Sequence, residues 1–181
     1  MEGRIERLAR ILSERKAILT GRFVLSSGRV SKVYLDLRLL LGDPRSFRKA
    51  LSLLDEAAPK AEIPILGVAT GGIAWAVGLS LLREVPSGYV RVEAKGHGVG
   101  RRVEGMPPKG PVIIVDDVAT TGRSLSAAVE AARSEGYEPI AAVVLVDREE
   151  GASEALEELG VKLYSVARLS EVLEALGIRI P

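Results

Sequence analysis

The sequence predicts an α/β protein in which a parallel sheet is flanked by helices. Three apolar strand patterns, at residues 63–69, 112–118 and 140–146, are separated by segments with helical periodicity. Apolar runs of this kind are typical of strands buried on both faces, and their alternation with helices favours parallel connections. The 181 residues suffice for one substantial core. We therefore treat residues 1–181 as a single domain.

Composition excludes several classes of protein. Lys and Arg total 25 against 24 Asp and Glu, so the chain lacks the large net positive charge that attracts nucleic acid. Cysteine is absent, which excludes a disulfide framework and a thiolate metal site. No apolar run approaches membrane-spanning length, and the charged N-terminus shows no signal peptide. We expect a soluble cytoplasmic protein that binds neither nucleic acid nor membranes.

The N-terminal third is predicted to contain a helix, a hairpin and a second helix. Residues 2–19 have an amphipathic helical pattern. Strand-like Phe23–Leu25 and Val33–Leu37 flank the turn at residues 26–28, and this pattern alone favours a simple hairpin. Asp43 followed by Pro44 is typical of a helix start, with a capping carboxylate and a proline in the first turn.

Two loops that follow predicted central strands suit an anion. The strand at 63–69 runs into Thr70, Gly71 and Gly72 and then into an apolar helix. Free N–H groups at the start of a helix bind phosphates, although an ordinary tight turn is the alternative here.

The second loop joins the strand at 112–118 to a helix that begins near Arg123. Asp116 and Asp117 lie at the strand end, and Thr120, Thr121 and Ser124 supply hydroxyl donors. Gly122 permits close backbone approach. We expect the loop to bind a phosphate. We expect the two carboxylates to bind ribose hydroxyls, with a divalent cation nearby. A solvated turn with a helix cap is the alternative.

Two further segments carry candidate functional residues. Residues 93–110 form a glycine-rich, mostly basic loop without predicted structure, which is typical of a functional segment. It contains His97, the only histidine, which could also be simply exposed. Asp147 and Arg148 follow the strand at 140–146, which we expect to be fully buried. Such a pair is usually a surface salt bridge, but the carboxyl ends of parallel strands are also where ligands bind.

Four motifs, spread over about residues 20–150, resemble those of a known family in the same order. The run V-I-I-V-D-D-V-A-T-T-G-R-S at 112–124 resembles the phosphoribosyl-diphosphate (PRPP) signature of type I phosphoribosyltransferases. The runs F-V-L-S-S-G-R-V-S, Y-V-R-V-E-A-K-G-H-G and L-V-D-R-E-E-G resemble segments of orotate phosphoribosyltransferases. The resemblance implies a type I phosphoribosyltransferase-like fold, with about residues 1–40 contributing a small hood and residues 93–110 a mobile catalytic loop.

The resemblance also implies a reaction: transfer of the ribose 5-phosphate of PRPP to orotate, giving orotidine 5′-phosphate and diphosphate in UMP biosynthesis. The implied catalytic residues are Lys95, His97, Asp116 and Asp117. The implied PRPP-binding residues are Thr70, Gly71, Gly72, Arg91, Lys95, His97, Asp116, Asp117, Val118, Ala119, Thr120, Thr121, Gly122, Arg123 and Ser124. The implied orotate-binding residues are Ser26, Tyr34, Thr120 and Arg148.

The family further implies Mg²⁺, held mainly by PRPP and reached by Asp116 or Asp117 through water. It implies a homodimer in which the catalytic loop acts in the partner's site. Lysines found in some members are replaced here by Ser26, Gly71 and Val92. Two alternatives remain open: a phosphoribosyltransferase for another nucleobase, and a PRPP-sensing regulator on the same fold.

Overall fold

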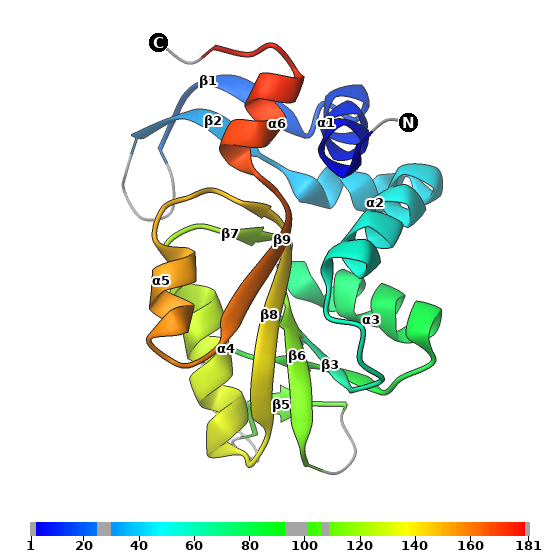
Figure 1. Ribbon diagram of the computed structural model, residues 1–181, viewed down its shortest axis with the longest axis vertical. Helices are drawn as coiled ribbons and strands as arrows, with labels where there is room; N and C mark the ends of the chain where they lie inside the picture. Colours follow the sequence, from blue (N-terminus) through cyan, green and yellow to red (C-terminus); the bar gives the residue numbers. More distant parts are fainter. Residues whose placement is uncertain (1–2, 25–29, 93–100, 106–108, 180–181) are drawn as a thin grey trace.

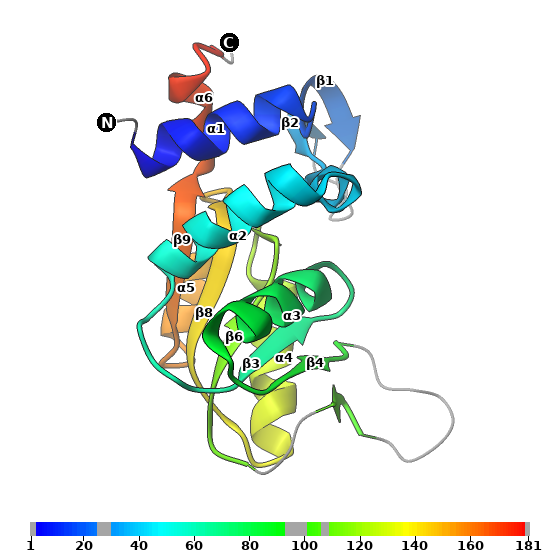
Figure 2. The ribbon, with the colours of Figure 1, turned by 90° about the vertical axis from the view of Figure 1, so that its right-hand side faces the viewer.

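A central sheet with helices on both faces carries a small N-terminal hood at one end. Figure 1 shows this arrangement in the computed structural model, which describes residues 3–24, 30–92, 101–105 and 109–179. Both ends of the described chain lie near the hood (Figures 1 and 2). None of the helices in these ranges has the length and apolar character needed to cross a bilayer.

The strands of the central sheet run in the order β5-β4-β3-β6-β8-β7, with β9 also paired to β8. All neighbours are parallel except β4 and β5, which are antiparallel. The strands are β3 (Ile65–Val68), β4 (Ser87–Val90), β5 (Val103–Glu104), β6 (Pro111–Val115), β7 (Val118–Ala119), β8 (Glu138–Asp147) and β9 (Lys162–Arg168). The predicted parallel sheet flanked by helices is therefore confirmed.

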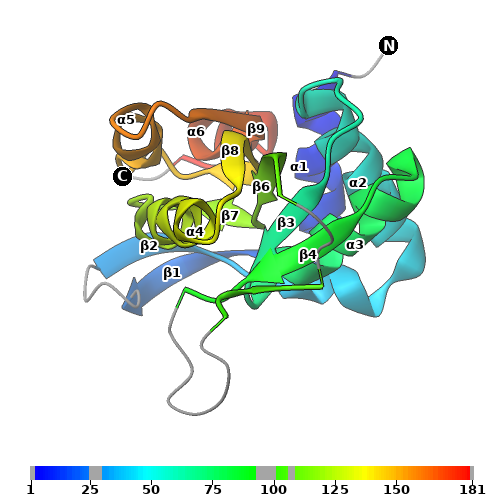
Figure 3. The same cartoon turned by 90° about the horizontal axis from the view of Figure 1, so that it is seen from below.

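The two faces of the sheet support separate hydrophobic cores. Side chains alternate between faces along each strand, so Ile113 and Val115 join one core and Ile114 the other. Helices α1 (Arg4–Glu14), α2 (Pro44–Ala57), α3 (Gly71–Arg83) and α6 (Leu169–Ala175) and the 3-10 helix η1 (Leu37–Gly42) contribute to the first core, and α4 (Arg123–Ser134) and α5 (Ala152–Glu157) to the second. Figure 3, seen along the sheet, shows these layers.

The hood consists of the antiparallel pair β1 (Ile18–Val24) and β2 (Val30–Leu35), with α1 and α6 beside it (Figure 2). The turn expected at 26–28 lies outside the described residues. The predicted start of the following helix is confirmed, since the Asp43 carboxylate accepts a hydrogen bond from Ser46 N at 3.1 Å and Pro44 opens α2.

The strand expected at 112–118 is interrupted at the two aspartates. β6 ends at Val115, and β7 resumes pairing with β8 at Val118. The Asp116 carboxylate accepts from Asp117 N, and the Asp117 carboxylate accepts from Val118 N. Short acidic side chains often compete in this way for backbone groups that a strand would pair. The chain therefore bends where both carboxylates meet the pocket described below.

Three smaller expectations need correction. The strand expected at 63–69 is shorter, covering Ile65–Val68. Ile140 is 42% exposed rather than buried, and it lies where the register of β8 against β6 shifts between Pro139 and Ala141. The segment 93–110 is not wholly irregular, because Val103–Glu104 pair with β4 and Val103 is buried.

Candidate active site

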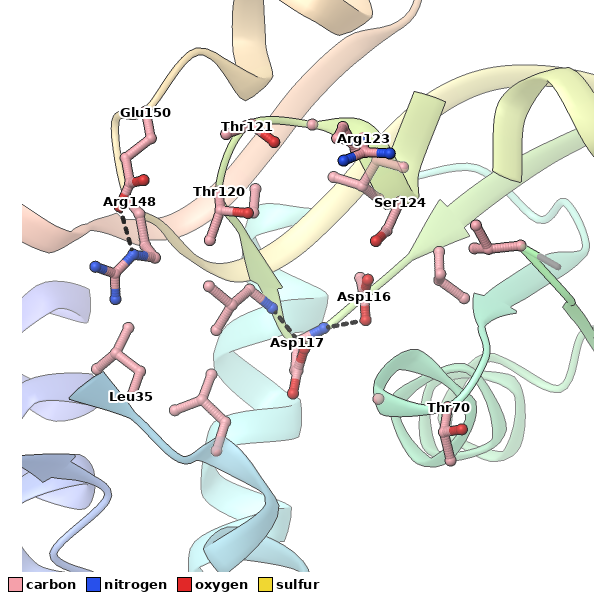
Figure 4. Close-up of a pocket in the computed structure, with 18 of the residues that line it drawn as sticks. Leu35, Thr70, Asp116, Asp117, Thr120, Thr121, Arg123, Ser124, Arg148 and Glu150 are labelled. Carbon is pink, nitrogen blue, oxygen red and sulfur yellow. Dashed lines mark hydrogen bonds and ion pairs between the residues drawn. The ribbon is translucent and has the colours of Figure 1, made fainter. Parts of the chain in front are cut away.

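One pocket lies between the hood and the carboxyl ends of β3, β6 and β8. Its volume is about 890 Å³, within the range of about 300–1,000 Å³ that is common for small-molecule sites. Parallel strands end at the same edge of a sheet, so the loops that follow them converge there. The hood closes the opposite side with Tyr34 and Leu35, together with Arg38 of η1. Figure 4 shows Leu35 of the hood across a common space from Thr120 and Arg148.

The loop before α4 forms an anion site at one end of the pocket. Thr120, Thr121 and Ser124 line the pocket, and no side chain caps the helix. Its first N–H groups therefore lack intrahelical partners and carry the positive end of the helix dipole. Gly122 has φ +83°, and a Cβ there would come within 3.0 Å of the Ala155 Cβ. The loop thus requires glycine for its conformation and for its packing on α5.

Asp116 and Asp117 line the pocket, and among the described residues neither carboxylate forms an ion pair. Asp116 is 8% exposed, and burial raises the pKa of its carboxyl well above the usual value, with the Asp117 charge adding to this effect. Burial also raises the pKa of Asp117, while Arg38 opposes the shift weakly. A buried and a half-buried carboxylate side by side repel each other, so the site favours ligands that supply hydroxyl donors or a cation.

The start of α3 approaches both aspartates. Thr70 and Gly71 line the pocket, and no side chain caps this helix either. A Cβ added at Gly71 would lie 2.9 Å from Asp117 Oδ1 and 3.1 Å from Asp116 Oδ1. Gly72 lies behind the pocket, where a Cβ would clash with the Val115 carbonyl. The two glycines therefore let a second uncapped helix start lie directly beside the acids.

Arg148 closes the other end of the pocket. It is 8% exposed, and its Nε donates to Glu150 Oε1 at 2.8 Å (Figure 4). Its Nη2 donates to Ser31 Oγ at 3.0 Å, which links β2 of the hood to the end of β8. The alternative of a surface pair with Asp147 is therefore wrong, because the partner is Glu150 and the guanidinium is buried.

Tyr34 lies on the hood side of the pocket. Its hydroxyl accepts from Arg38 Nη2 at 3.2 Å, and its ring centroid is 5.5 Å from that of Phe23. The ring is therefore held in place by contacts on both sides. It offers an apolar surface at the end of the pocket that also contains Arg148.

Most of the predicted site residues converge on this pocket. Those that line it are Tyr34, Thr70, Gly71, Asp116, Asp117, Val118, Ala119, Thr120, Thr121, Gly122, Arg123, Ser124 and Arg148. Arg91 does not line it, and its Nε instead lies 3.5 Å from Glu104 Oε1. Ser26, Lys95 and His97 lie outside the described residues.

The sequence reasoning missed Leu35, Arg38 and Glu150, which also line the pocket. Arg38 and Glu150 are charged residues close to predicted strand ends, and that position was the available signal. Leu35 gave no signal, because it looks like any apolar strand residue.

Comparison with known proteins identifies the family. Residues 45–159 match the phosphoribosyl transferase domain. The chain is 54% identical to the orotate phosphoribosyltransferase of Aeropyrum pernix over 95% of this chain and 94% of that protein. This chain belongs to the orotate phosphoribosyltransferase family. The crystal structure of the Aeropyrum pernix protein superposes with a TM-score of 0.88, covering 94% of this chain and 98% of that one.

A more distant member of the family has been solved with a substrate. The Mycobacterium tuberculosis orotate phosphoribosyltransferase in complex with PRPP is 29% identical, with a TM-score of 0.74 over 93% of this chain and 98% of that one. The resemblance drawn from the four motifs is thus confirmed at the level of family and fold. The roles of individual residues in this chain remain predictions.

Proposed function

We propose that this protein catalyses the transfer of ribose 5-phosphate from PRPP to orotate. In this reaction the bond between ribose C1 and the diphosphate oxygen breaks, and a bond from an orotate nitrogen to C1 forms. The products are orotidine 5′-phosphate and diphosphate. The observation that carries the proposal is one pocket that joins an uncapped helix start, a buried and a half-buried aspartate, and a buried arginine. We further propose that the enzyme acts in the cytoplasm, in pyrimidine biosynthesis.

The phosphate end of the pocket would hold the ribose 5-phosphate. Backbone N–H groups at the start of α4 and the hydroxyls of Thr120, Thr121 and Ser124 would donate to the phosphate oxygens. Asp116 and Asp117 would accept hydrogen bonds from the ribose hydroxyls. Fixing the sugar in this way would orient C1 toward the base. The translational and rotational freedom of the sugar is then lost on binding and not in the chemical step.

The hood end of the pocket would hold orotate. The Arg148 guanidinium carries five donors in a planar fork, which suits the carboxylate and carbonyl edge of this base. Tyr34 would pack against the ring, with Thr120 and Ser26 as further contacts implied by the family. Nη1 of Arg148 lies 3.4 Å from the Val33 carbonyl, a long contact that a carboxylate oxygen could replace.

The leaving diphosphate would meet the uncapped start of α3 at Thr70, Gly71 and Gly72. Lys95, His97 and Arg91 are the proposed cationic contacts. Positive groups at this position stabilise the charge that develops on the departing diphosphate, and this is how they would lower the barrier. Because Arg91 does not line the pocket of its own chain, it is a candidate for a contact made in a partner's site.

The acidic pair fits a divalent cation that the substrate largely holds. Burial raises the pKa of both carboxyls, which means that their negative charges are unfavourable in the ligand-free site. A positive charge nearby would stabilise the ionised carboxylates. Within the described ranges no cluster of three or more metal-ligating side chains exists, so these residues alone do not offer a full ligand set. When bound, Mg²⁺ would make the diphosphate a better leaving group. We therefore propose that turnover requires Mg²⁺ and stops with a chelator.

We also propose a homodimer in which residues 93–110 serve the partner's site. Helix α3 exposes Val77, Leu81 and Leu82, the second of these to 77%. An apolar stripe beside the β4–β5 edge supports association with a second copy. Leu81→Arg should yield a monomer by sedimentation, whereas Leu81→Met should remain dimeric.

Mixing two inactive variants would test whether the loop acts in the partner's site. One carries Lys95→Ala, and the other carries Asp116→Asn with Asp117→Asn. If the loop acts in the partner's site, each mixed dimer regains one complete site, and activity returns to at most about half by two-fold symmetry. No recovery despite proven subunit exchange would show that each loop serves its own chain.

A panel of bases tests the activity itself. With PRPP and magnesium present, orotate should be consumed, and its near-ultraviolet absorbance should fall. Adenine, hypoxanthine and uracil should turn over far more slowly. Equal or faster turnover of one of them would point to a phosphoribosyltransferase for that base. PRPP binding without turnover of any base would point to a PRPP-sensing regulator.

A further inference from the structure

The strands on either side of residues 93–100 are tied together by one guanidinium that the proposed chemistry does not use. β4 and β5 pair through Tyr89 with Glu104 and through Val90 with Val103. Beyond that ladder, Arg91 N donates to the Arg102 carbonyl at 2.8 Å. The Arg102 side chain then donates from Nε to the Arg91 carbonyl at 3.1 Å and from Nη2 to the Val92 carbonyl. Arg102 thus holds the last two carbonyl groups before residue 93.

A carboxylate from α4 holds the returning strand. Glu135 Oε1 accepts from Arg102 N and from Val103 N, the latter at 3.2 Å. Glu135 is the C-cap residue that follows α4, 33 positions away from Arg102 in the sequence. Hydrogen bonds to an ionised acceptor are about twice as strong as neutral ones. Both N–H groups depend on this single oxygen within the described structure.

Helix α4 therefore connects the phosphate loop of this chain to the strands that flank residues 93–100. Its N-terminal end belongs to the phosphate loop at Gly122 and Arg123, and Glu135, the residue just after its C-terminal end, holds β5. Twelve residues separate these ends, a length of about 18 Å for an α-helix. Figure 1 shows α4 running lengthwise beside the sheet toward the end at which β5 lies.

We infer that Glu135 and Arg102 are positioning residues for the reaction: they hold the two strands from which residues 93–100 arise against each other and against the end of α4. Lys95 and His97 belong to that segment, so this inference rests on the function proposed above. Neither Glu135 nor Arg102 lines the pocket as described. Their effect should thus reach catalysis only through the residues that they hold.

Replacing Glu135 tests this role. Glu135→Ala removes the acceptor for both N–H groups, whereas Glu135→Gln keeps an oxygen at the same place and serves as the matched control. We expect kcat for orotate and PRPP to fall on the order of 10- to 100-fold in the alanine variant, because small misplacements of catalytic groups have effects of that size. The glutamine variant should stay near the wild-type rate. Binding of ribose 5-phosphate, which lacks the diphosphate, should be unchanged in both.

Hydrogen exchange gives a readout that does not depend on activity. The amides of Arg102 and Val103 should exchange faster in Glu135→Ala than in Glu135→Gln, while amides in β6 and β8 should keep their protection. Arg102→Lys should lower kcat less than Arg102→Ala, since an ammonium group can still reach one of the two carbonyls.

Each of the following outcomes would contradict a different claim. Unchanged exchange at residues 102 and 103 in Glu135→Ala would show that the anchor does not exist in solution. Faster exchange with wild-type kcat would show that the anchor does not serve catalysis. Loss of ribose 5-phosphate binding together with kcat would mean that Glu135 merely supports the fold. A wild-type protein that does not turn over orotate with PRPP would instead refute the proposed function, whatever the exchange data show.

Discussion

The two ends of the pocket are built in different ways. The phosphate end comes from one continuous stretch, in which Asp116, Asp117 and Thr120–Ser124 follow a buried strand and lead into α4. The base end is assembled from distant parts, because Arg148 donates to Ser31, which is 117 positions away in the sequence. The first end depends mainly on local backbone geometry, whereas the second depends on how the hood docks on the sheet.

This difference suggests how each end responds to substitution. A change at the phosphate end should affect one substrate and leave the fold intact, because its ligand groups are mostly backbone N–H groups and exposed hydroxyls. A change at the base end removes a buried charge with partners on two elements, so its effects on binding and on hood docking must be separated. Four predictions follow this division, from the largest expected effect to the smallest.

The double replacement Asp116→Asn with Asp117→Asn should lower kcat/KM at least about 1,000-fold, the size of loss seen when charged or preorganised groups leave an active site. Asparagine keeps the shape and the oxygen that accepts each backbone N–H. The far-ultraviolet circular dichroism spectrum should therefore match the wild type. A collapse in thermal stability would show that the pair is structural.

Arg148→Ala should raise the KM for orotate about 100-fold, because hydrogen bonds to charged groups contribute about 1.5–3 kcal/mol each. The KM for PRPP should change little. Glu150→Gln is the control, since it keeps an oxygen for Arg148 Nε and removes a negative charge beside the proposed orotate subsite, so the KM for orotate should not rise. Equal changes in both KM values for Arg148→Ala would mean that the arginine only docks the hood.

Thr121→Val should weaken PRPP binding about tenfold, which corresponds to the loss of one hydrogen bond of about 1.4 kcal/mol. Thr121→Ser keeps the hydroxyl and should bind PRPP nearly as well as the wild type. Isothermal titration of the variants with PRPP measures the difference directly. An unchanged affinity in Thr121→Val would place the 5′-phosphate elsewhere.

Stability should depend on pH through the aspartate pair. Burial and Asp117 raise the pKa of Asp116 in the folded chain above its ordinary value of 3.8. The folded state then binds more protons than the unfolded state, so the stability of the ligand-free protein falls as pH rises from 3.8 through the raised pKa. Asp116→Asn removes this loss and should raise Tm at neutral pH by about 2–4 °C, the change that 1 kcal/mol produces in a domain of this size. A lower Tm in this variant would contradict the burial of an unpaired charge.

The contrast between the two ends also explains how much of the site could be predicted. The sequence predicted the phosphate loop, its aspartates and the helix start at Arg123, because residues that are consecutive in this part of the chain are also neighbours in the site. The pairing of Arg148 with Glu150 and Ser31 could not be predicted from the sequence, since it depends on the docking of β2 against the end of β8. The same applies to Glu135, whose contact with Arg102 and Val103 joins elements that no periodicity connects. The break between β6 and β7 was missed because an apolar run does not show where side chains capture backbone N–H groups.

A crystal structure with orotidine 5′-phosphate bound tests the account most directly, because this molecule carries both groups that the two ends are proposed to hold. The 5′-phosphate should lie against Thr120–Ser124 at the start of α4, with the ribose hydroxyls on Asp116 and Asp117. The orotate carboxylate should lie within hydrogen-bonding distance of the Arg148 guanidinium. A phosphate bound at Arg148, or a base that makes no contact with the hood end of the pocket, would contradict the assignment of the two ends.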